Sequence, residues 1–285
     1  MDGASKITRP APISLPTNTG AQPRAVGSVM MSTKTAAGRS ALEDLRQSGA
    51  MKALFPRPDT AALQAIVINT AGGVTGGDNF TLTARAGENS HLSLTTQAAE
   101  RAYQAQPEQI ASVSNRLFAS RGARIDWLPQ ETILYESCAM RRQMSVELDE
   151  GASLLLVEPL VFGRAAMGEV LRHGSFSDRI DIRRKGQPLY LDAMTLQGDI
   201  AGHLASSGVA AGAGALATVV YVAADAERHL APVRASLPEM AGVSLIQSDL
   251  LVARILAPDS FALRQSLIPI PKHLTNDALP RSWIT

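Results

Sequence analysis

Apolar and polar positions alternate along most of the chain between residues 80 and 194. Phe80, Leu82 and Ala84 alternate with polar neighbours, and a second alternating segment carries Leu92 and Leu94. The same period of two returns in short runs at 110–118, 125–128, 132–135, 144–148, 179–183 and 189–194. Such alternation is typical of β-strands that bury one face. The pattern therefore predicts many short strands.

Other segments predict strands by different patterns. Residues 154–157 are apolar at every position, which predicts a strand that is buried on both faces. Apolar runs at 63–68, 218–223 and 250–256 predict three further strands. Turns centred on glycine separate the strands at short intervals, and this arrangement favours a mainly β protein built as a sandwich, a barrel or a solenoid.

Three segments carry helix signals. Ser40 is followed three residues later by Glu43, which resembles a capping box and predicts a short helix over 40–47. Near the C-terminus, residues 225–237 place apolar side chains on one helical face, and Asp259 precedes a helix predicted over 260–267. The expected fold is therefore mainly β, with two short C-terminal helices.

The N-terminal segment differs from the remainder in composition. Residues 1–27 contain four prolines among small and polar residues and no apolar core of a signal peptide, so we expect a disordered tail there. No interdomain linker follows. A chain of 285 residues is close to the upper size for one hydrophobic core, so residues 28–285 are predicted to form one domain.

The composition excludes several classes of protein. A net charge of +1 and 19% charged residues argue against a general nucleic-acid binder, and we interpret the Arg141-Arg142 pair as part of a solvated face. Cys138 is the single cysteine, which excludes an intramolecular disulfide and a thiolate zinc cluster and favours an inert thiol in a reducing, cytoplasmic compartment. No apolar run approaches the ~20 residues that a membrane helix needs.

A glycine-rich segment at 71–78 contains Gly72, Gly73, Gly76 and Gly77. One interpretation is a loop that binds phosphate, as in a nucleotide-binding enzyme. However, the segment lacks the Gly-Lys-Ser/Thr ending of a P-loop, and a predicted strand follows it where a P-loop needs a helix. A sharp crossover between strands is therefore the favoured interpretation, although Asp78 could still be functional.

Four carboxylates lie in turns or strands that are otherwise built of apolar and small residues: Asp78, Glu158, Glu169 and Asp192. Burying such charges is costly unless they are paired or hydrated. They could form structural ion pairs, for example Glu169 with Arg164, or they could line a hydrated passage for a cation, which carboxylate oxygens would bind weakly. The five histidines are scattered, and no tight metal site is predicted unless distant histidines converge.

Five motifs in the same order resemble those of the UreD family of urease accessory proteins, also called UreH. Each motif is modest, but together they span residues 69–283. They are Asn-Thr-Ala-Gly-Gly-Val-Thr-Gly-Gly-Asp at 69–78, Thr-Thr-Gln-Ala-Ala-Glu-Arg-Ala-Tyr at 95–103, Trp-Leu-Pro-Gln-Glu-Thr-Ile-Leu at 127–134, Gly-Arg and Gly-Glu at 163–164 and 168–169, and Pro-Arg-Ser-Trp at 280–283. The residues that carry the match include Gly72, Gly73, Gly76, Gly77, Trp127, Arg164 and Trp283.

The resemblance implies a β-helix-like, two-layer fold and a protein without catalytic activity of its own. It implies a scaffold that binds the urease apoenzyme, a UreF-like protein and a UreG-like GTPase. Nickel would be cargo in transit, with no permanently bound cofactor. The alternatives are a nucleotide-binding enzyme that uses the glycine-rich loop and a purely structural β-sandwich interaction protein.

Overall fold

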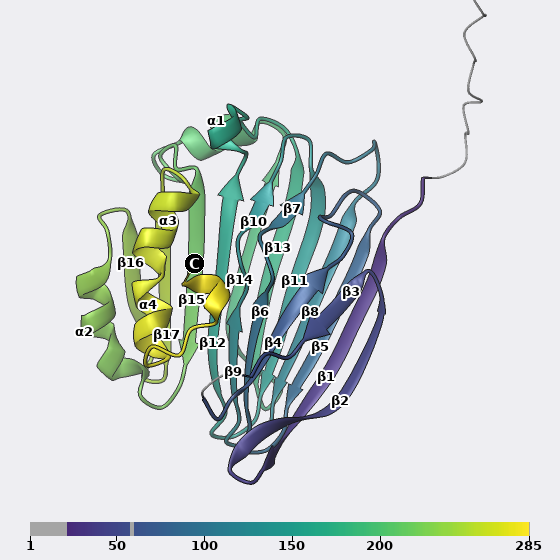
Figure 1. Ribbon diagram of the computed structural model, residues 1–285. Coiled ribbons are helices and arrows are strands. Elements are labelled where there is room, and N and C mark those ends of the chain that lie inside the picture. The colour runs from purple at the N-terminus through teal and green to yellow at the C-terminus, as the bar shows by residue number, and fades with distance from the viewer. Residues whose placement is uncertain (1–21, 58–59, 285) are drawn as a thin grey trace, which may run out of the picture.

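A computed structural model describes residues 22–57 and 60–284 of the chain. Residues 1–21, which hold most of the predicted tail, lie outside the described residues. The predicted boundary between tail and domain, at residues 27 and 28, falls within the first strand, β1 (Val26–Ala36). The strands form two sheets that face each other, and helices cover one of them (Figure 1).

The first sheet has seven strands, and its central strands are parallel. Its order is β14 (Gln187–Gln197), β13 (Ser175–Arg184), β11 (Ala139–Leu148), β8 (Ala111–Ala119), β5 (Asn79–Ala86), β1 and β2 (Arg39–Gly49). The parallel strands β5, β8 and β11 stay in register, so that Thr81 lies beside Ser114 and Ser114 beside Gln143.

The second sheet has ten strands. Its main path is β16 (Ala241–Gln247), β17 (Leu250–Ala257), β15 (Ala215–Val222), β12 (Ser153–Phe162), β9 (Arg124–Leu128), β6 (His91–Thr96), β4 (Leu63–Asn69) and β3 (Met51–Leu54). Two short strands, β10 (Thr132–Leu134) and β7 (Glu100–Ala102), extend from β12 beside this path.

The chain passes from one sheet to the other as it proceeds from β4 to β13, and consecutive strands within each sheet are parallel. Each pair of passes therefore adds one coil to a stack. This arrangement confirms the prediction of a mainly β, β-helix-like, two-layer fold. The two facing sheets explain the alternation of apolar and polar residues, because each strand turns one face toward the opposite sheet.

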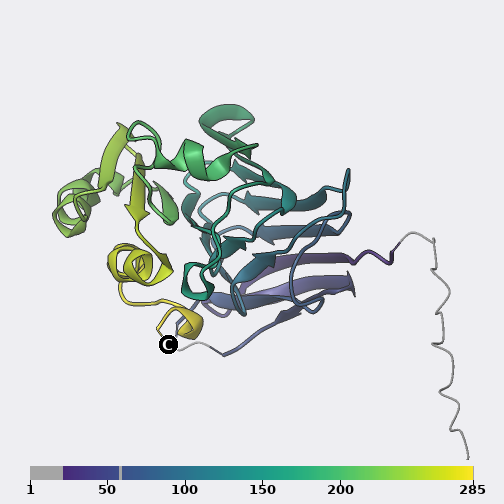
Figure 2. The same cartoon turned by 90° about the horizontal axis from the view of Figure 1, so that it is seen from above.

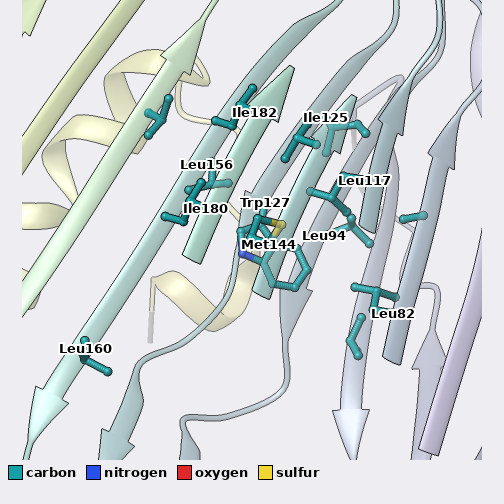
Figure 3. Packing of buried hydrophobic residues seen from close by; sticks show 14 of the residues in the cluster. Leu82, Leu94, Leu117, Ile125, Trp127, Met144, Leu156, Leu160, Ile180 and Ile182 are labelled. Atoms are coloured by element: carbon teal, nitrogen blue, oxygen red, sulfur yellow. The ribbon is translucent and has the colours of Figure 1, made fainter. Parts of the chain in front are cut away.

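The space between the sheets holds the larger of two hydrophobic cores. Figure 3 shows side chains from both sheets in this space, among them Leu82 and Leu117 from the first sheet and Leu94 and Ile125 from the second. All four are at most 1% exposed. Aliphatic side chains thus supply most of the apolar burial that holds the sheets together.

A second core lies on the outer side of the second sheet, beneath the C-terminal helices (Figure 2). The predicted helices at 225–237 and 260–267 are confirmed as α2 (Ala226–Ser236) and α3 (Ser260–Leu267). Asp259 caps α3, since its side chain accepts a hydrogen bond from the amide of Ala262 at 2.8 Å.

The structure also contains helical segments that the pattern did not predict. They are α1 (Ile200–Ala205), α4 (Pro269–Leu274), and the 3-10 turns η1 (Ala165–Met167) and η2 (Arg281–Trp283). Pro269 occupies the first turn of α4, where its missing amide hydrogen costs little. No helix among the described residues is long and apolar enough to cross a membrane.

The strand β12 contributes to both cores and confirms the prediction of a strand buried on both faces. Its residues Leu154, Leu156 and Leu160 belong to the core between the sheets. Leu155 and Val157 belong to the outer core. Because β12 pairs with β9 on one side and β15 on the other, it joins the coils to the C-terminal strands.

The helix predicted over 40–47 is wrong, because these residues lie in the strand β2. Ala37 and Gly38 have positive φ angles of 49° and 75° and form a two-residue hairpin turn that pairs β2 with β1. The Ser40 hydroxyl accepts a hydrogen bond from the amide of His91 at 2.7 Å, so it does not cap a helix. Long-range pairing therefore overrides the local capping signal.

Candidate cation passage between the sheets

The glycine-rich loop crosses from β4 in the second sheet to β5 in the first, as the favoured interpretation predicted. Gly76 has no room for a side chain, because a Cβ atom there would lie 2.5 Å from the carbonyl oxygen of Gln109. A Cβ atom on Gly73 would lie 2.3 Å from the Tyr103 ring. Since β5 follows the loop, no helix N-terminus is available to hold a phosphate.

Asp78 ties this loop to the start of the domain. Its Oδ1 accepts a hydrogen bond from the amide of Ala25 and its Oδ2 accepts one from the amide of Thr75, both at 2.8 Å. The side chain is buried, with 5% of the residue exposed. Because backbone amides occupy both oxygens, the geometry gives Asp78 a structural role.

Glu169 forms the ion pair with Arg164 that the sequence suggested, at 2.6 Å between Oε2 and Nη2. Arg164 also lies over the ring of Tyr135, with its guanidinium carbon 4.3 Å from the ring centre. The hydrogen bond from Arg164 lowers the pKa of Glu169 below its usual value. This pair is partly exposed, away from the space between the sheets.

Glu158 lies between the sheets on β12 and is 5% exposed. Its Oε1 accepts a hydrogen bond from Nε1 of Trp127 at 2.7 Å, which gives this motif tryptophan a defined contact. Its Oε2 lies 2.7 Å from Nη1 of Arg142. Burial raises the pKa of Glu158, while the charge of Arg142 opposes that rise.

The interpretation of Arg142 as part of a solvated face is wrong. Only 6% of the residue is exposed, and its Nε and Nη2 donate hydrogen bonds to the two carboxylate oxygens of Asp178 at 2.9 and 2.6 Å. Strand pairing explains the burial: Met140, Met144 and Val146 share the alternating face of β11 with Arg142, and this face is turned toward the second sheet.

Asp178 was not predicted as a site residue either, although its place in an alternating strand indicates that it is buried. It occupies an alternating, buried position on β13 together with Phe176, Ile180 and Ile182. A charged residue at an apolar position of such a pattern implies a buried partner. In this chain the partner is Arg142, so two neighbouring strands of the first sheet present opposite charges to Glu158.

Asp192 also has a partner. Its Oδ2 forms an ion pair with Nη2 of Arg254, which joins β14 in the first sheet to β17 in the second. Each of the four carboxylates singled out by sequence therefore contacts either an arginine or backbone amides. Glu158 and Asp192 come together at one small cavity, and Asp78 and Glu169 are not among its lining residues.

Two cavities meet at Glu158 and Arg142. The larger has a volume of about 300 Å³, and its lining includes Gly72, Gly73, Glu100 and Trp127 in addition to these two residues. The smaller has a volume of about 20 Å³, and its lining includes Asp178, Asp192, Thr218 and Arg254 in addition to the same two residues. Since a water molecule needs about 10–15 Å³, even the smaller cavity can hold one.

Glu100 adds a further carboxylate to the larger cavity. Burial raises its pKa, whereas a hydrogen bond from Asn69 opposes the rise. The lining of the two cavities thus combines apolar side chains with carboxylate oxygens, which are the ligands that hard and borderline cations accept.

Cysteine and histidine are the other residue types that commonly bind metal ions. Cys138 is buried, and burial raises the pKa of its thiol to about 11, in keeping with an inert thiol. Two distant histidines do converge, with Nδ1 of His229 3.0 Å from Nε2 of His273. Among residues 22–57 and 60–284, however, no group of three or more His, Cys, Asp or Glu side chains is placed to hold a metal ion.

Trp283, the last motif residue, fastens the C-terminal segment to the second sheet. It is 2% exposed, and its Nε1 donates a hydrogen bond to the carbonyl oxygen of Leu128 at 2.8 Å. The side chain of Arg264 on α3 donates to the carbonyl oxygen of Trp283 at 3.2 Å. The motif therefore stabilises the outer core.

Comparison with known proteins agrees with these motifs. The family described as UreD urease accessory protein matches residues 25–283. A protein of Ruegeria pomeroyi called urease accessory protein UreD is 54% identical over 253 residues, which cover 89% of this chain and 98% of that protein. Proteins with the same name from Roseobacter denitrificans and Rhizobium rhizogenes are 52% and 40% identical, and the matches cover 92% and 91% of this chain and 96% and 95% of those proteins. The chain therefore belongs to the UreD family of urease accessory proteins.

Proposed function

We propose that this protein is a non-catalytic scaffold for the maturation of urease and that nickel ions pass between its two sheets on the way to the urease active site. The observation that carries the proposal is the pair of cavities that meet at Glu158 and Arg142. Nickel is the cargo in this proposal and is not a resident cofactor.

The chemistry of the cavities suits transient binding. Glu158, Asp178 and Asp192 offer carboxylate oxygens along the smaller cavity, and Glu100 offers them in the larger one. An ion in transit must be bound strongly enough to enter and weakly enough to leave. Carboxylates that already pair with arginines provide weak net attraction, because the arginines offset most of their charge.

The proposed partners are the urease apoenzyme, a UreF-like protein and a UreG-like GTPase, and the proposed compartment is the cytoplasm. The sequence lacks a P-loop, which supports placing GTP hydrolysis on a partner. The buried, unreactive thiol of Cys138 suits a reducing compartment.

We place the UreF-like protein on the C-terminal helices. α3 buries Leu263 and Leu267 against the second sheet, while Phe261 on the same helix is 70% exposed. An exposed aromatic residue on a helix suits helix-to-helix docking. Phe261→Asp should abolish co-purification of the UreF-like protein, whereas Leu191→Asp, on a strand residue that is 57% exposed, should leave it intact. Retained binding in a folded Phe261→Asp variant would reject this placement.

The scaffold itself can be tested in a urease-positive bacterium that lacks its own UreD gene. An affinity-tagged copy of this chain should restore urease activity and the nickel content of urease, and it should co-purify with the apoenzyme and both partners. Nickel insertion should require GTP. A folded, expressed chain that captures none of these proteins and leaves urease free of nickel would refute the proposed function.

A further inference from the structure

The cluster around Arg142 has an unusual composition for a structural ion pair. One guanidinium faces two buried carboxyl groups, so a single Arg142 serves two acidic partners. Arg142, Glu158 and Asp178 are 6%, 5% and 8% exposed. A structural ion pair needs only one carboxylate for one guanidinium, so the second acidic group is more than such a pair requires.

Oxygen atoms surround the guanidinium on several sides. Oε2 of Glu158 lies 2.7 Å from Nη1, and Oδ2 of Asp178 lies 2.6 Å from Nη2. The hydroxyl oxygen of Thr132 lies 3.1 Å from Nη1. Two carboxylates and a hydroxyl that converge on one cation are also oxygen ligands of the kind that divalent cations bind.

The guanidinium also lies where the two cavities meet. Arg142 and Glu158 line both, so a path from the larger cavity to the smaller one passes this cluster. The larger cavity, at about 300 Å³, offers space into which the long arginine side chain could move. Glu100, a partly buried carboxylate, also lines that space.

We propose that Glu158 and Asp178 form a binding site for a divalent cation, and that the guanidinium of Arg142 occupies this site until the ion displaces it. In the arrangement seen here Arg142 lies where the two cavities meet and its single charge faces both carboxyl groups. Displacement of Arg142 opens the connection and exposes oxygen ligands at the same time. The identification of the cation as nickel rests on the proposed function, whereas the site itself does not.

The test uses the full-length chain with a solubility tag and Ni²⁺ as the probe, with Mg²⁺ for comparison. Arg142→Met removes the competing guanidinium, so the Ni²⁺ dissociation constant should fall by about tenfold. Ni²⁺ should also raise the melting temperature of this variant more than that of the unsubstituted protein. Adding Asp178→Asn to Arg142→Met removes one ligand and should reverse both effects.

Two further variants keep the test decisive. Arg142→Met leaves two buried carboxylates without a partner and could fail to fold, whereas Arg142→Lys retains the positive charge but cannot hold both carboxylates by planar, bidentate contacts. Arg142→Lys should bind Ni²⁺ about threefold more tightly than the unsubstituted protein. Arg164→Met, in the partly exposed pair with Glu169, is the matched control and should leave Ni²⁺ affinity unchanged.

If neither folded Arg142 variant binds Ni²⁺ more tightly than the unsubstituted protein, the cluster is only structural and the proposal is wrong. If Arg142→Met does not fold, the result with Arg142→Lys decides. Because the measurement uses no urease and no partner protein, it is independent of the test of the proposed function. Loss of partner binding in cells would refute the scaffold role without affecting this site.

Discussion

The two sides of the second sheet bury different kinds of side chain. Toward the first sheet, β12 presents Glu158 among leucines, and two cavities interrupt the packing there. On the outer side, the same strand presents Leu155 and Val157 to a core of aliphatic residues and Trp283 beneath the C-terminal helices. The outer core is suited to holding the fold, whereas the space between the sheets includes charged groups that stability alone does not require.

This difference separates the residues that maintain the structure from those available for transport. The outer side also carries buried carboxylates, among them Asp126 and Glu131. Asp126 lies near the margin of the core, where the side chain of its partner His91 is 34% exposed. The charges between the sheets instead line the two cavities that meet at Glu158 and Arg142. Substitutions on the two sides should therefore separate loss of stability from loss of nickel delivery.

The largest expected effect concerns the outer core. Trp283→Ala removes a buried side chain and its hydrogen bond to Leu128, and it should lower the free energy of unfolding by about 3–5 kcal/mol. Ile284→Ala, at a neighbouring residue that is 69% exposed, should change it by less than about 0.5 kcal/mol. Urea denaturation measures both changes. Equal effects of the two substitutions would show that Trp283 does not anchor the segment.

The buried charge at the margin should produce a pH-dependent effect. Burial alone would raise the pKa of Asp126, but the hydrogen bond from His91 and the charge of Arg124 outweigh it and lower this pKa below 3.8. Asp126→Asn should therefore cost about 1.5–3 kcal/mol of unfolding free energy at pH 7. The contribution is present above the unfolded pKa, so the difference should shrink as the pH falls below about 4.

Urea denaturation between pH 7 and pH 3 measures this dependence. Glu88→Gln is the control, because Glu88 and Arg121 form an exposed pair whose removal should cost less than about 1 kcal/mol. A difference between Asp126→Asn and the unsubstituted protein that stays constant down to pH 3 would contradict the assigned pKa shift.

The crossover loop should tolerate no side chain at Gly76. Gly76→Ala places a Cβ atom against the carbonyl oxygen of Gln109 and should destabilise the protein by about 1–3 kcal/mol. Gly242→Ala is a suitable control, since no atom lies within 4 Å of a Cβ atom built there. Thermal unfolding compares the two. Equal melting temperatures for the two variants would show that the loop can adjust.

The smallest effect is on chemical reactivity. With the pKa of Cys138 raised to about 11, almost none of its thiol is ionised at pH 8. Alkylation by iodoacetamide should be about a hundredfold slower in the folded protein than in urea, because the thiolate is the reactive form. Mass spectrometry follows the reaction. Fast labelling of the folded protein would contradict the burial of this residue between the sheets.

Much of the fold could be predicted from the alternation of residues, because strands that bury one face impose a period of two on the sequence. The segment 40–47 could not, since its pairing partner β1 and the turn at Ala37 and Gly38 decide its conformation from outside the segment. The short helix α4 could not be predicted either, because a proline usually indicates the end of a helix, whereas Pro269 lies at the beginning of one.

The site was only partly accessible from the sequence. Glu158 was found because it follows a fully apolar run, but Arg142 was assigned to the surface by its basic neighbour Arg141. The alternation of buried and exposed positions would have corrected this surface assignment, since Arg142 and Asp178 both occupy buried positions of alternating strands. The ion pair between Asp192 and Arg254 could not be predicted, because it joins strands of different sheets that are 62 residues apart.

The most direct test of the passage measures nickel in urease matured by the Glu158→Gln/Asp192→Asn double variant. Arg142, Arg254, Glu158, Asp178 and Asp192 all line the smaller cavity, and the double substitution removes two of its three carboxyl groups while both guanidiniums remain. The account predicts a variant that folds and assembles with its partners but yields urease with severalfold less nickel, while Asp78→Asn variants that assemble deliver the full amount. Full nickel occupancy with the double variant would contradict passage between the sheets.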